Sequence, residues 1–198
     1  MKKLLLTAFE PFGGENINAS LEAQKMVPDC IGDWEIEKIR VPVVFGKDAE
    51  TVLEKAEEIQ PKAILCLGQA ETRELVSPEF VGINFMDGRI ADNAGLKPVR
   101  QEIVPGGPAA YFTTMPAFEM ADAIKAAGMG TKVSYSAGTY VCNDLFYRLL
   151  HHYSLTGEEV TVGFIHVPVT PEQAVEGKPS METAEAAKAI ISAIEALV

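Results

Sequence analysis

The sequence predicts a single α/β domain spanning residues 1–198, in which a mostly parallel, twisted sheet carries helices on both faces. Its length of 198 residues is that of one ordinary domain. Its composition, 47% apolar and 23% charged, is typical of a compact soluble protein. Short apolar runs alternate with segments of helical periodicity, which indicates parallel strands connected by helices.

Five segments are short, apolar or rich in β-branched residues, and bounded by turn residues, so we expect each to form a strand. In chain order they are residues 3–9, 34–43, 63–67, 131–135 and 160–167. The first could be mistaken for a signal peptide. Its apolar run ends at Phe9, because Glu10-Pro11 follows at once, and no small-residue cleavage site comes after it. A buried first strand is therefore the better interpretation.

Helical patterns lie between and after these strands, at residues 17–26, 47–59, 115–127, 142–153 and 181–197. The last segment places its apolar residues at the spacing of one helix face, as expected for a helix packed on a sheet. Residues 68–116 break the alternation, because they are rich in Gly, Pro, Asn and Asp. There we expect long loops, which are usually functional, with a hairpin around residues 75–85.

Charge and cysteine content exclude several classes of function. The net charge of −11 argues against binding nucleic acid or an anionic membrane, and no stretch approaches the ~20 apolar residues of a membrane span. Cys30, Cys66 and Cys142 form no CxxC pair, and two of the three histidines are adjacent, so no zinc site or other metal or cofactor is expected. Free thiols fit a reducing compartment, which predicts a cytoplasmic protein.

Cys142 is the first candidate for chemistry. A strand is expected to end near Ala137, Gly138 permits a sharp turn, and a helix is expected to begin close to Cys142. The N–H groups and the dipole at the amino end of a helix favour a thiolate, and the same N–H groups could bind an oxyanion. The alternative is a small buried core residue, the commoner fate of a free cysteine. That alternative is preferred for Cys66, which lies within an apolar strand.

A reactive thiol needs a base, and the best candidate is His166. His151 and His152 lie more than two helical turns beyond Cys142. His166 ends a predicted strand. If that strand is parallel to residues 131–135, its carboxyl end lies at the same sheet edge as Cys142, where α/β sites form. Taken alone, His166 could equally be a satisfied core histidine.

A third group should fix the imidazole of the base. The irregular segment offers five acidic residues for this role, which are Glu71, Glu74, Glu79, Asp87 and Asp92. The residues alone do not choose among them.

Five blocks of sequence, spread from Leu5 to about Gln173, resemble those of one known family. They are Thr7-Ala8-Phe9-Glu10-Pro11-Phe12-Gly13-Gly14 with Asn18; Gly68-Gln69-Ala70-Glu71-Thr72-Arg73 with Glu79 and Ile83-Asn84; Asp92-Asn93-Ala94-Gly95 with Ala110-Tyr111-Phe112-Thr113-Thr114-Met115-Pro116; Ser136-Ala137-Gly138-Thr139-Tyr140-Val141-Cys142-Asn143; and Phe164-Ile165-His166-Val167-Pro168. In this order and spacing they resemble pyroglutamyl peptidase I, a family of cysteine peptidases.

The resemblance implies a Cys142–His166–Glu79 triad, with Glu74 as the fallback carboxylate. It also implies that Arg89 stabilises charge at the scissile carbonyl. Apolar walls around a flat lactam ring would come from Phe9, Phe12, Tyr140 and Val141, whereas Gln69 and backbone groups near Asn18 would bind its amide. The chain departs from the family pattern around Glu79, where Phe80 replaces a usual basic residue and Gly82 a usual alanine, and at Ala19, where proline is common.

The expected function is therefore that of a cysteine exopeptidase, an omega-peptidase. It would hydrolyse the amide bond after an amino-terminal pyroglutamyl residue through a thioester, without a cofactor. One alternative is a cysteine amidase or thioesterase acting on another small acyl group, and another is a non-catalytic binding module. The resemblance also implies a homo-oligomer, often a tetramer.

Overall fold

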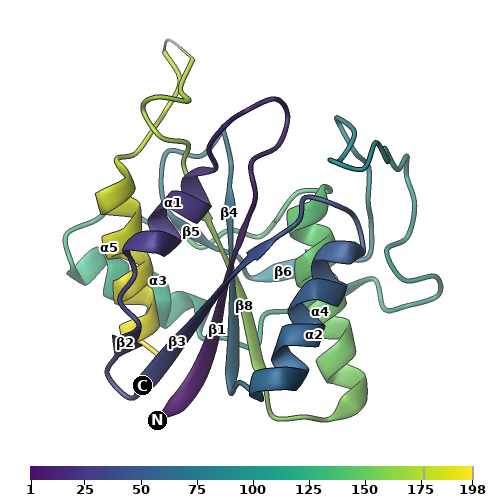
Figure 1. Cartoon of the computed structure of the whole chain (residues 1–198), viewed down its shortest axis with the longest axis horizontal. Coiled ribbons are helices and arrows are strands. Elements are labelled where there is room, and N and C mark those ends of the chain that lie inside the picture. The colour runs from purple at the N-terminus through teal and green to yellow at the C-terminus, as the bar shows by residue number, and fades with distance from the viewer. Residues whose placement is uncertain (176, 198) are drawn as a thin grey trace.

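In the part of the chain that the structure describes, which is all of it except residues 176 and 198, a six-stranded sheet forms the centre of the molecule (Figure 1). Its order is β2-β3-β1-β4-β8-β5, with the bounds Cys30–Ile31, Trp34–Val41, Lys2–Phe9, Ala63–Gln69, Thr161–Val167 and Ser77–Pro78. The four long strands are mutually parallel, and the two short edge strands run antiparallel to their neighbours. The predicted mostly parallel sheet is confirmed.

The central strands are apolar at almost every position because both faces of the sheet are covered. In β1, Leu4, Leu5 and Leu6 are all 0% exposed although they point to alternate faces. β4 and β8 are buried in the same way and pair in register, so that Gly68 lies opposite His166. This pairing brings the carboxyl ends of β4 and β8 to the same edge.

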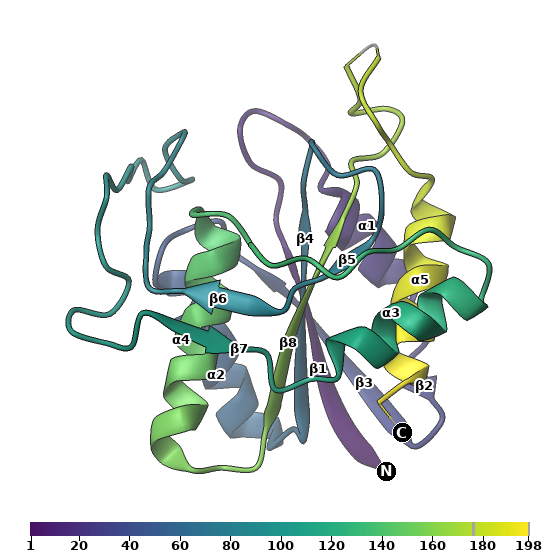
Figure 2. The same ribbon diagram turned by 180° about the vertical axis from the view of Figure 1, so that it is seen from behind.

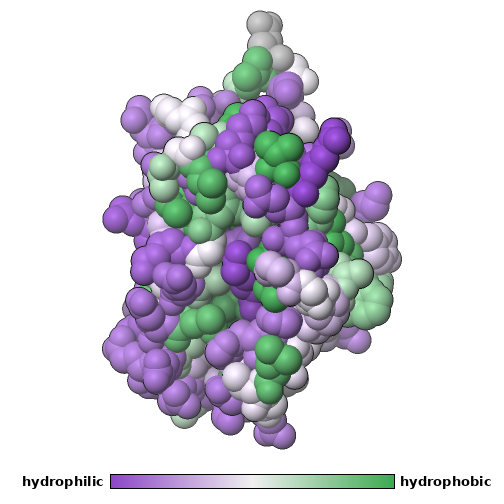
Figure 3. Space-filling view, turned by 90° about the vertical axis from the view of Figure 1, so that its right-hand side faces the viewer, coloured by the Kyte–Doolittle hydropathy of each residue, from purple (hydrophilic) through white to green (hydrophobic). Residues whose placement is uncertain are grey.

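Helices cover both faces of the sheet, as predicted (Figures 1 and 2). One face carries α1 (Ala19–Met26), α3 (Ala117–Ala126) and α5 (Thr183–Glu195), and the other carries α2 (Lys47–Ile59) and α4 (Val141–Thr156). The outer surface of the second pair is mainly hydrophilic, with apolar side chains scattered among polar ones (Figure 3). None of the described helices is long and apolar enough to cross a membrane.

The prediction of a strand at residues 131–135 is wrong. Thr131 and Ser134 form only isolated bridges, with Val76 and Glu79 respectively. A continuous ladder is prevented because Pro78, within β5, has no N–H group to donate. These bridges are parallel to β5, which is antiparallel to β8, so this segment also runs antiparallel to β8 rather than parallel as assumed.

The predicted hairpin around residues 75–85 is also wrong. β5 pairs with β8, and the next strand, β6 (Val81–Ile83), pairs with a distant strand that the sequence pattern missed, β7 (Ala110–Phe112). The side chain of Asn84 stabilises this long-range pairing. Its Nδ2 donates to the carbonyl oxygens of Val104 and Gly107, and its Oδ1 accepts from the Val104 N–H.

Candidate active site

The candidate site lies at the carboxyl ends of the parallel strands, where α/β proteins place their sites. Phe9 ends β1, Gln69 ends β4, and His166 is the penultimate residue of β8. The segment before α4 reaches this edge through a turn at Gly138, whose φ of 80° lies in the region that favours glycine. α4 then begins one residue before Cys142, so the thiol belongs to its first turn.

His166 is held by Glu79. The imidazole Nδ1 lies 2.7 Å from Oε1 of Glu79, and both side chains are almost completely buried. The Glu79 backbone N–H donates to the Phe164 carbonyl at 2.8 Å, which fixes the carboxylate beside β8. Of the five acidic residues considered above, Glu79 is the one that contacts the imidazole, whereas the fallback Glu74 is exposed. This contact leaves Nε2 of His166 as the ring nitrogen available for proton transfer.

A small cavity of about 140 Å³ opens beside the thiol. Its lining is Phe9, Phe12, Asn18, Val43, Gln69, Ala137, Gly138, Thr139, Tyr140, Val141, Cys142 and His166. All six residues expected to bind substrate are among these, together with Cys142 and His166. The structure adds four residues that were not expected there as ligands, of which Ala137, Gly138 and Thr139 lie shortly before Cys142 in sequence.

Aromatic rings form one side of the cavity. The ring of Tyr140 lies 6.1 Å from that of Phe12 and 5.3 Å, edge-on, from that of Phe45. The Tyr140 hydroxyl donates to the Ala91 carbonyl at 3.0 Å. Burial raises the pKa of Tyr140 to about 12, helped by the negative charge of Asp92. Tyr140 is therefore neutral at physiological pH, and the cavity suits a flat, uncharged ring.

One amide is oriented for hydrogen bonding inside this cavity. Oε1 of Gln69 accepts from the Ala19 N–H at 2.7 Å and from Nε2 of Gln173 at 3.1 Å. These two bonds fix which end of the amide is the oxygen, and Nε2 of Gln69 donates no hydrogen bond among the described residues. Gln173 was not expected at the site.

Both ends of the Asn18 side-chain amide already form hydrogen bonds within the protein. Its Oδ1 accepts from the Ser20 N–H at 3.0 Å as the cap of α1, and its Nδ2 donates to the Glu10 carbonyl at 3.1 Å. A ligand would therefore meet backbone groups near Asn18 rather than its amide.

The environment of Cys142 opposes ionisation. Burial raises the pKa of the Cys142 thiol, and the negative charges of Asp48 and Glu79 raise it further, whereas its own backbone N–H lowers it. We expected the amino end of α4 to favour a thiolate, whereas burial acts in the opposite direction. The thiol consequently needs a neighbouring base to remove its proton.

Arg89 is exposed and does not line the cavity. Its loop is nevertheless attached to the cavity wall. The Asp87 N–H donates to the Thr139 carbonyl at 2.9 Å, and the Thr139 hydroxyl donates to the Asp87 carbonyl at 3.0 Å. The positive charge of Arg89 lowers the pKa of the Tyr140 phenol, against the effect of burial. The role expected for Arg89 at the scissile carbonyl stays a prediction.

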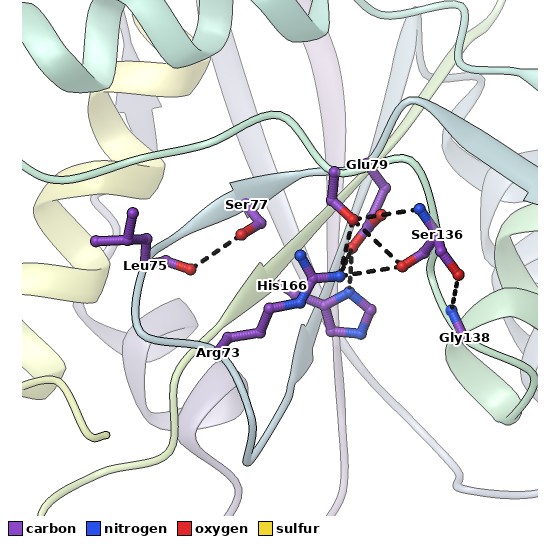
Figure 4. A network of polar contacts seen from close by, with 8 residues as sticks. Arg73, Leu75, Ser77, Glu79, Ser136, Gly138 and His166 are labelled. Atoms are coloured by element: carbon purple, nitrogen blue, oxygen red, sulfur yellow. Dashed lines mark hydrogen bonds and ion pairs between the residues drawn. The ribbon is translucent and has the colours of Figure 1, made fainter. Parts of the chain in front are cut away.

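Sequence reasoning missed Arg73, from the loop between β4 and β5. Its guanidinium Nη2 lies 2.7 Å from Oε1 of Glu79, 2.8 Å from the Ser134 hydroxyl and 3.0 Å from the Ser136 carbonyl oxygen. Figure 4 shows this guanidinium and the His166 ring converging on the same carboxylate. Arg73 belongs to the glutamate block of the family resemblance, but nothing in its spacing indicates this contact.

The remaining cysteines and histidines lie elsewhere. Cys66 is buried in β4, where burial raises its pKa to about 12, and Cys30 is exposed on β2. Nδ1 of His151 lies 2.9 Å from the Tyr111 hydroxyl, far along α4. The described residues contain no group of three or more His, Cys, Asp or Glu side chains that could hold a metal ion.

The chain is similar to known proteins of one family. A family model described as pyroglutamyl peptidase matches residues 2–198. The pyrrolidone-carboxylate peptidase of Levilactobacillus brevis is 44% identical over 198 residues, covering 99% of this chain and 97% of that protein. That of Vibrio vulnificus strain YJ016 is 49% identical over 183 residues, covering 91% and 85%.

Solved structures show the same fold. The crystal structure of pyroglutamyl peptidase I from Bacillus amyloliquefaciens superposes with a TM-score of 0.95 at 40% identity, covering 100% of this chain and 97% of that chain. The pyrrolidone carboxyl peptidase from Thermococcus litoralis superposes with a TM-score of 0.94 at 35% identity, covering 100% and 93%.

Proposed function

The chain belongs to the pyroglutamyl peptidase family, and from that premise we propose that Cys142, His166 and Glu79 hydrolyse the amide bond after an amino-terminal pyroglutamyl residue. The enzyme is a cysteine-type exopeptidase. The observation that carries the proposal is the cavity of about 140 Å³, into which the thiol and the Glu79-bound imidazole open beside one oriented amide. A cavity of this size fits a single small ring and favours an exopeptidase.

The reaction is an acyl transfer in two halves. His166 removes the Cys142 thiol proton, and the sulfur attacks the pyroglutamyl carbonyl carbon. Backbone N–H groups in the first turn of α4, with Arg89, stabilise the oxyanion. His166 then donates its proton to the leaving amine, and the C–N bond breaks to give a thioester. In the second half His166 activates water, which releases pyroglutamate and the free thiol. Glu79 orients the imidazole and stabilises its charged form.

The cavity explains selectivity for the lactam. Phe9, Phe12, Tyr140 and Val141 enclose the flat ring, and Nε2 of Gln69 is free to donate to the lactam carbonyl. A prolyl residue lacks that carbonyl, and binding it would leave the half-buried amide of Gln69 unpaired. Sites of this kind reject such analogues by large factors, about 10⁴ or more.

Hydrolysis of a pyroglutamyl arylamide under reducing conditions tests the proposal. We expect release of the arylamine, its loss after iodoacetamide treatment, and no turnover in Cys142→Ser or Cys142→Ala. Cys30→Ser is the matched control, because this thiol is exposed and on a distant edge strand. Turnover that survives in both Cys142 variants would contradict the assignment of the nucleophile.

A broader acyl specificity is the second candidate. The unusual residues around Glu79, with Phe80 in place of a basic residue, motivate it. Rates measured on pyroglutamyl, prolyl and glutaminyl amides separate the two. Equal rates on all three would favour a general cysteine amidase, whereas a strong preference for the lactam supports the narrower function.

The chain is further proposed to form a homo-oligomer in the cytoplasm, a tetramer by family resemblance. Exposed aromatic side chains support assembly, since the ring of Phe80 lies 5.0 Å from that of Phe112 and 5.3 Å from that of Phe118, which are 67% and 47% exposed. The free cysteines fit a reducing compartment. A mass near 21.4 kDa by light scattering at every concentration would contradict the oligomer.

A further inference from the structure

The carboxylate of Glu79 has two cationic or potentially cationic partners on one oxygen. Arg73 Nη2 and His166 Nδ1 each lie 2.7 Å from Oε1. The other oxygen, Oε2, is buried and has no hydrogen-bond partner among the described residues. Because Arg73 and His166 share Oε1, the positive charge of Arg73 weakens the attraction between this oxygen and the imidazole.

We infer that Arg73 is a positioning residue, which fixes the Glu79 carboxylate and limits how tightly that carboxylate holds the proton on His166. The inference rests on the proposed function of Cys142 and His166. A guanidinium is always charged in proteins, and here its side chain is 25% exposed while that of Glu79 is 0% exposed. Such a buried carboxylate needs a cation to offset the loss of hydration.

This arrangement matters because His166 must both accept and return a proton. A buried carboxylate paired with the imidazole alone would stabilise the imidazolium strongly and slow proton transfer to the leaving amine. Arg73 shares the negative charge, so the imidazolium gives up its proton more readily. The kinetic consequence lies in the chemical steps and not in substrate binding, because Arg73 does not line the cavity.

Arg73 also connects two parts of the site that are distant in sequence. The same Nη2 that contacts Glu79 donates to the Ser134 hydroxyl and the Ser136 carbonyl, and Ser136 immediately precedes the cavity-lining residues 137–142. The Ser134 hydroxyl in turn lies 3.2 Å from the Ser136 carbonyl oxygen. One side chain thus fixes the Glu79 carboxylate relative to the irregular segment that leads to Cys142 (Figure 4).

Other titratable groups around His166 do not supply an alternative cation. Cys142 and Tyr140 share its cavity, and the negative charge of Asp48 reaches the thiol from α2. The ion pairs that Glu79 forms among the described residues are those with Arg73 and His166. When the charge of Arg73 is removed, His166 should therefore be the one remaining ion-pair partner of Glu79 among the described residues.

The direct test is an NMR titration of the His166 ring in a Cys142→Ser background, where the chain has only three histidines to resolve. In Arg73→Gln the titration midpoint should rise by about one pH unit, a tenfold higher proton affinity. Arg73→Lys keeps the charge and should stay within about 0.3 pH units of the parent. The matched control is Lys132→Gln, which removes an exposed positive charge from the segment that also carries Ser134. It should leave the midpoint unchanged.

Kinetics of the same substitutions with Cys142 restored give a second readout. In Arg73→Gln we expect kcat on the arylamide to fall about tenfold with KM unchanged, and the acidic limb of the pH–rate profile to move to higher pH, because His166 must be unprotonated to accept a proton. Arg73→Lys should restore the position of that limb. A purely structural role for Arg73 would lower stability without moving either the limb or the NMR midpoint.

An unmoved midpoint in folded Arg73→Gln would overturn the inference. If that variant does not fold, Ser134→Ala keeps the ion pair but removes the second anchor of the guanidinium, and its midpoint should move upward by a smaller amount. No movement there would also overturn it. Because the titration needs no turnover, a shifted midpoint in a chain that does not cleave the arylamide supports the role of Arg73 while refuting the proposed function.

Discussion

Gly68 lies where any side chain would collide with the Cys142 thiol. A Cβ atom built on Gly68 would be 2.9 Å from the Cys142 sulfur and 2.9 Å from Cζ of Phe164. The residue lies opposite His166 in the β4–β8 register. Glycine is required here by close approach rather than by backbone conformation, because the thiol occupies the space directly above the strand.

Gly68→Ala should therefore displace the sulfur. We expect kcat on the arylamide to fall about 100-fold, the usual effect of a displacement near 1 Å at a reacting group. The free energy of unfolding should fall by about 1–3 kcal/mol from overpacking. The control is Gly163→Ala in β8, whose Cβ would meet Met115 instead. Urea denaturation should show a comparable loss for both, and equal losses of kcat would contradict this account.

Gln173 holds the amide of Gln69, which is proposed to bind the lactam. Its Nε2 donates to Oε1 of Gln69 and, at 3.2 Å, to the Ile17 carbonyl. In Gln173→Ala the Gln69 amide loses one of the two bonds that orient it, so binding of the lactam should weaken by about 1 kcal/mol, a fivefold rise in KM. Steady-state kinetics check this, and a fall in kcat with unchanged KM would argue against it.

Sequence reasoning proposed Cys142 and His166 but missed Arg73 and Gln173. Cys142 and His166 could be proposed because each ends or begins an element at an edge where sites form. Glu79 came from family resemblance alone, since five acidic residues were equally placed. Arg73 and Gln173 act through other side chains, and the contact between Gln173 and Gln69 joins residues 104 positions apart. No local pattern encodes such a contact.

At the scale of elements, α2 and α4 meet at two buried carboxyl groups. Asp48 in α2 and Asp144 in α4 are both 0% exposed. Asp144 accepts from the Gly46 N–H at 2.8 Å and pairs with Arg148 at 2.9 Å, whereas Oδ2 of Asp48 has no partner among the described residues. Burial, and then the negative charge of Asp144, raises the pKa of Asp48 well above the ordinary value of 3.8.

This raised pKa makes the protein lose stability as pH rises. The folded state binds the Asp48 proton more tightly than the unfolded state does, so the stabilisation is complete below the ordinary pKa and lost as pH rises through the raised one. Asp48→Asn should remove that loss. We expect its free energy of unfolding at pH 8 to exceed that of the parent by about 1–3 kcal/mol.

Urea denaturation between pH 4 and pH 9 measures the effect of Asp48→Asn. The gap between the variant and the parent should widen with increasing pH. Asp29→Asn is the control, because the Asp29 side chain is 86% exposed. The difference in free energy of unfolding between this variant and the parent should stay constant with pH. A gap for Asp48→Asn that narrows toward alkaline pH would show that Asp48 is ionised in the folded protein.

The elements that could be predicted were those defined by burial. Strands β1, β4 and β8 are apolar throughout because both faces are covered, and the long helices show one apolar face. The two-residue strand β5 and the pair β6–β7 have no such signature, since their partners are chosen by tertiary contacts such as the side chain of Asn84. The segment at residues 131–135 looked like a strand, but its neighbour contains Pro78.

At the scale of the whole molecule, the three thiols report on three different environments. Cys30 is exposed, Cys142 is partly buried at the cavity, and Cys66 is buried in the central strand β4 with a pKa raised to about 12. We expect Cys66 to react with a disulfide reagent only through global unfolding, at least about a thousandfold more slowly than Cys30. Mass spectrometry of labelled peptides over time checks this, and comparable labelling of Cys66 and Cys30 in the native protein would contradict it.

The place of β8 in the sheet determines when the sheet can be completed during synthesis. This strand is the last to be synthesised, yet it lies in the interior of the sheet, between β4 and β5. On the ribosome, β4 must wait with an open, unpaired edge until residues beyond 167 have left the exit tunnel. The orienting carboxylate and the thiol emerge earlier, but the imidazole arrives with the strand that closes the sheet. On the proposed function, peptidase activity therefore cannot begin before β8 pairs with β4, and α5 still has to pack on the sheet after that.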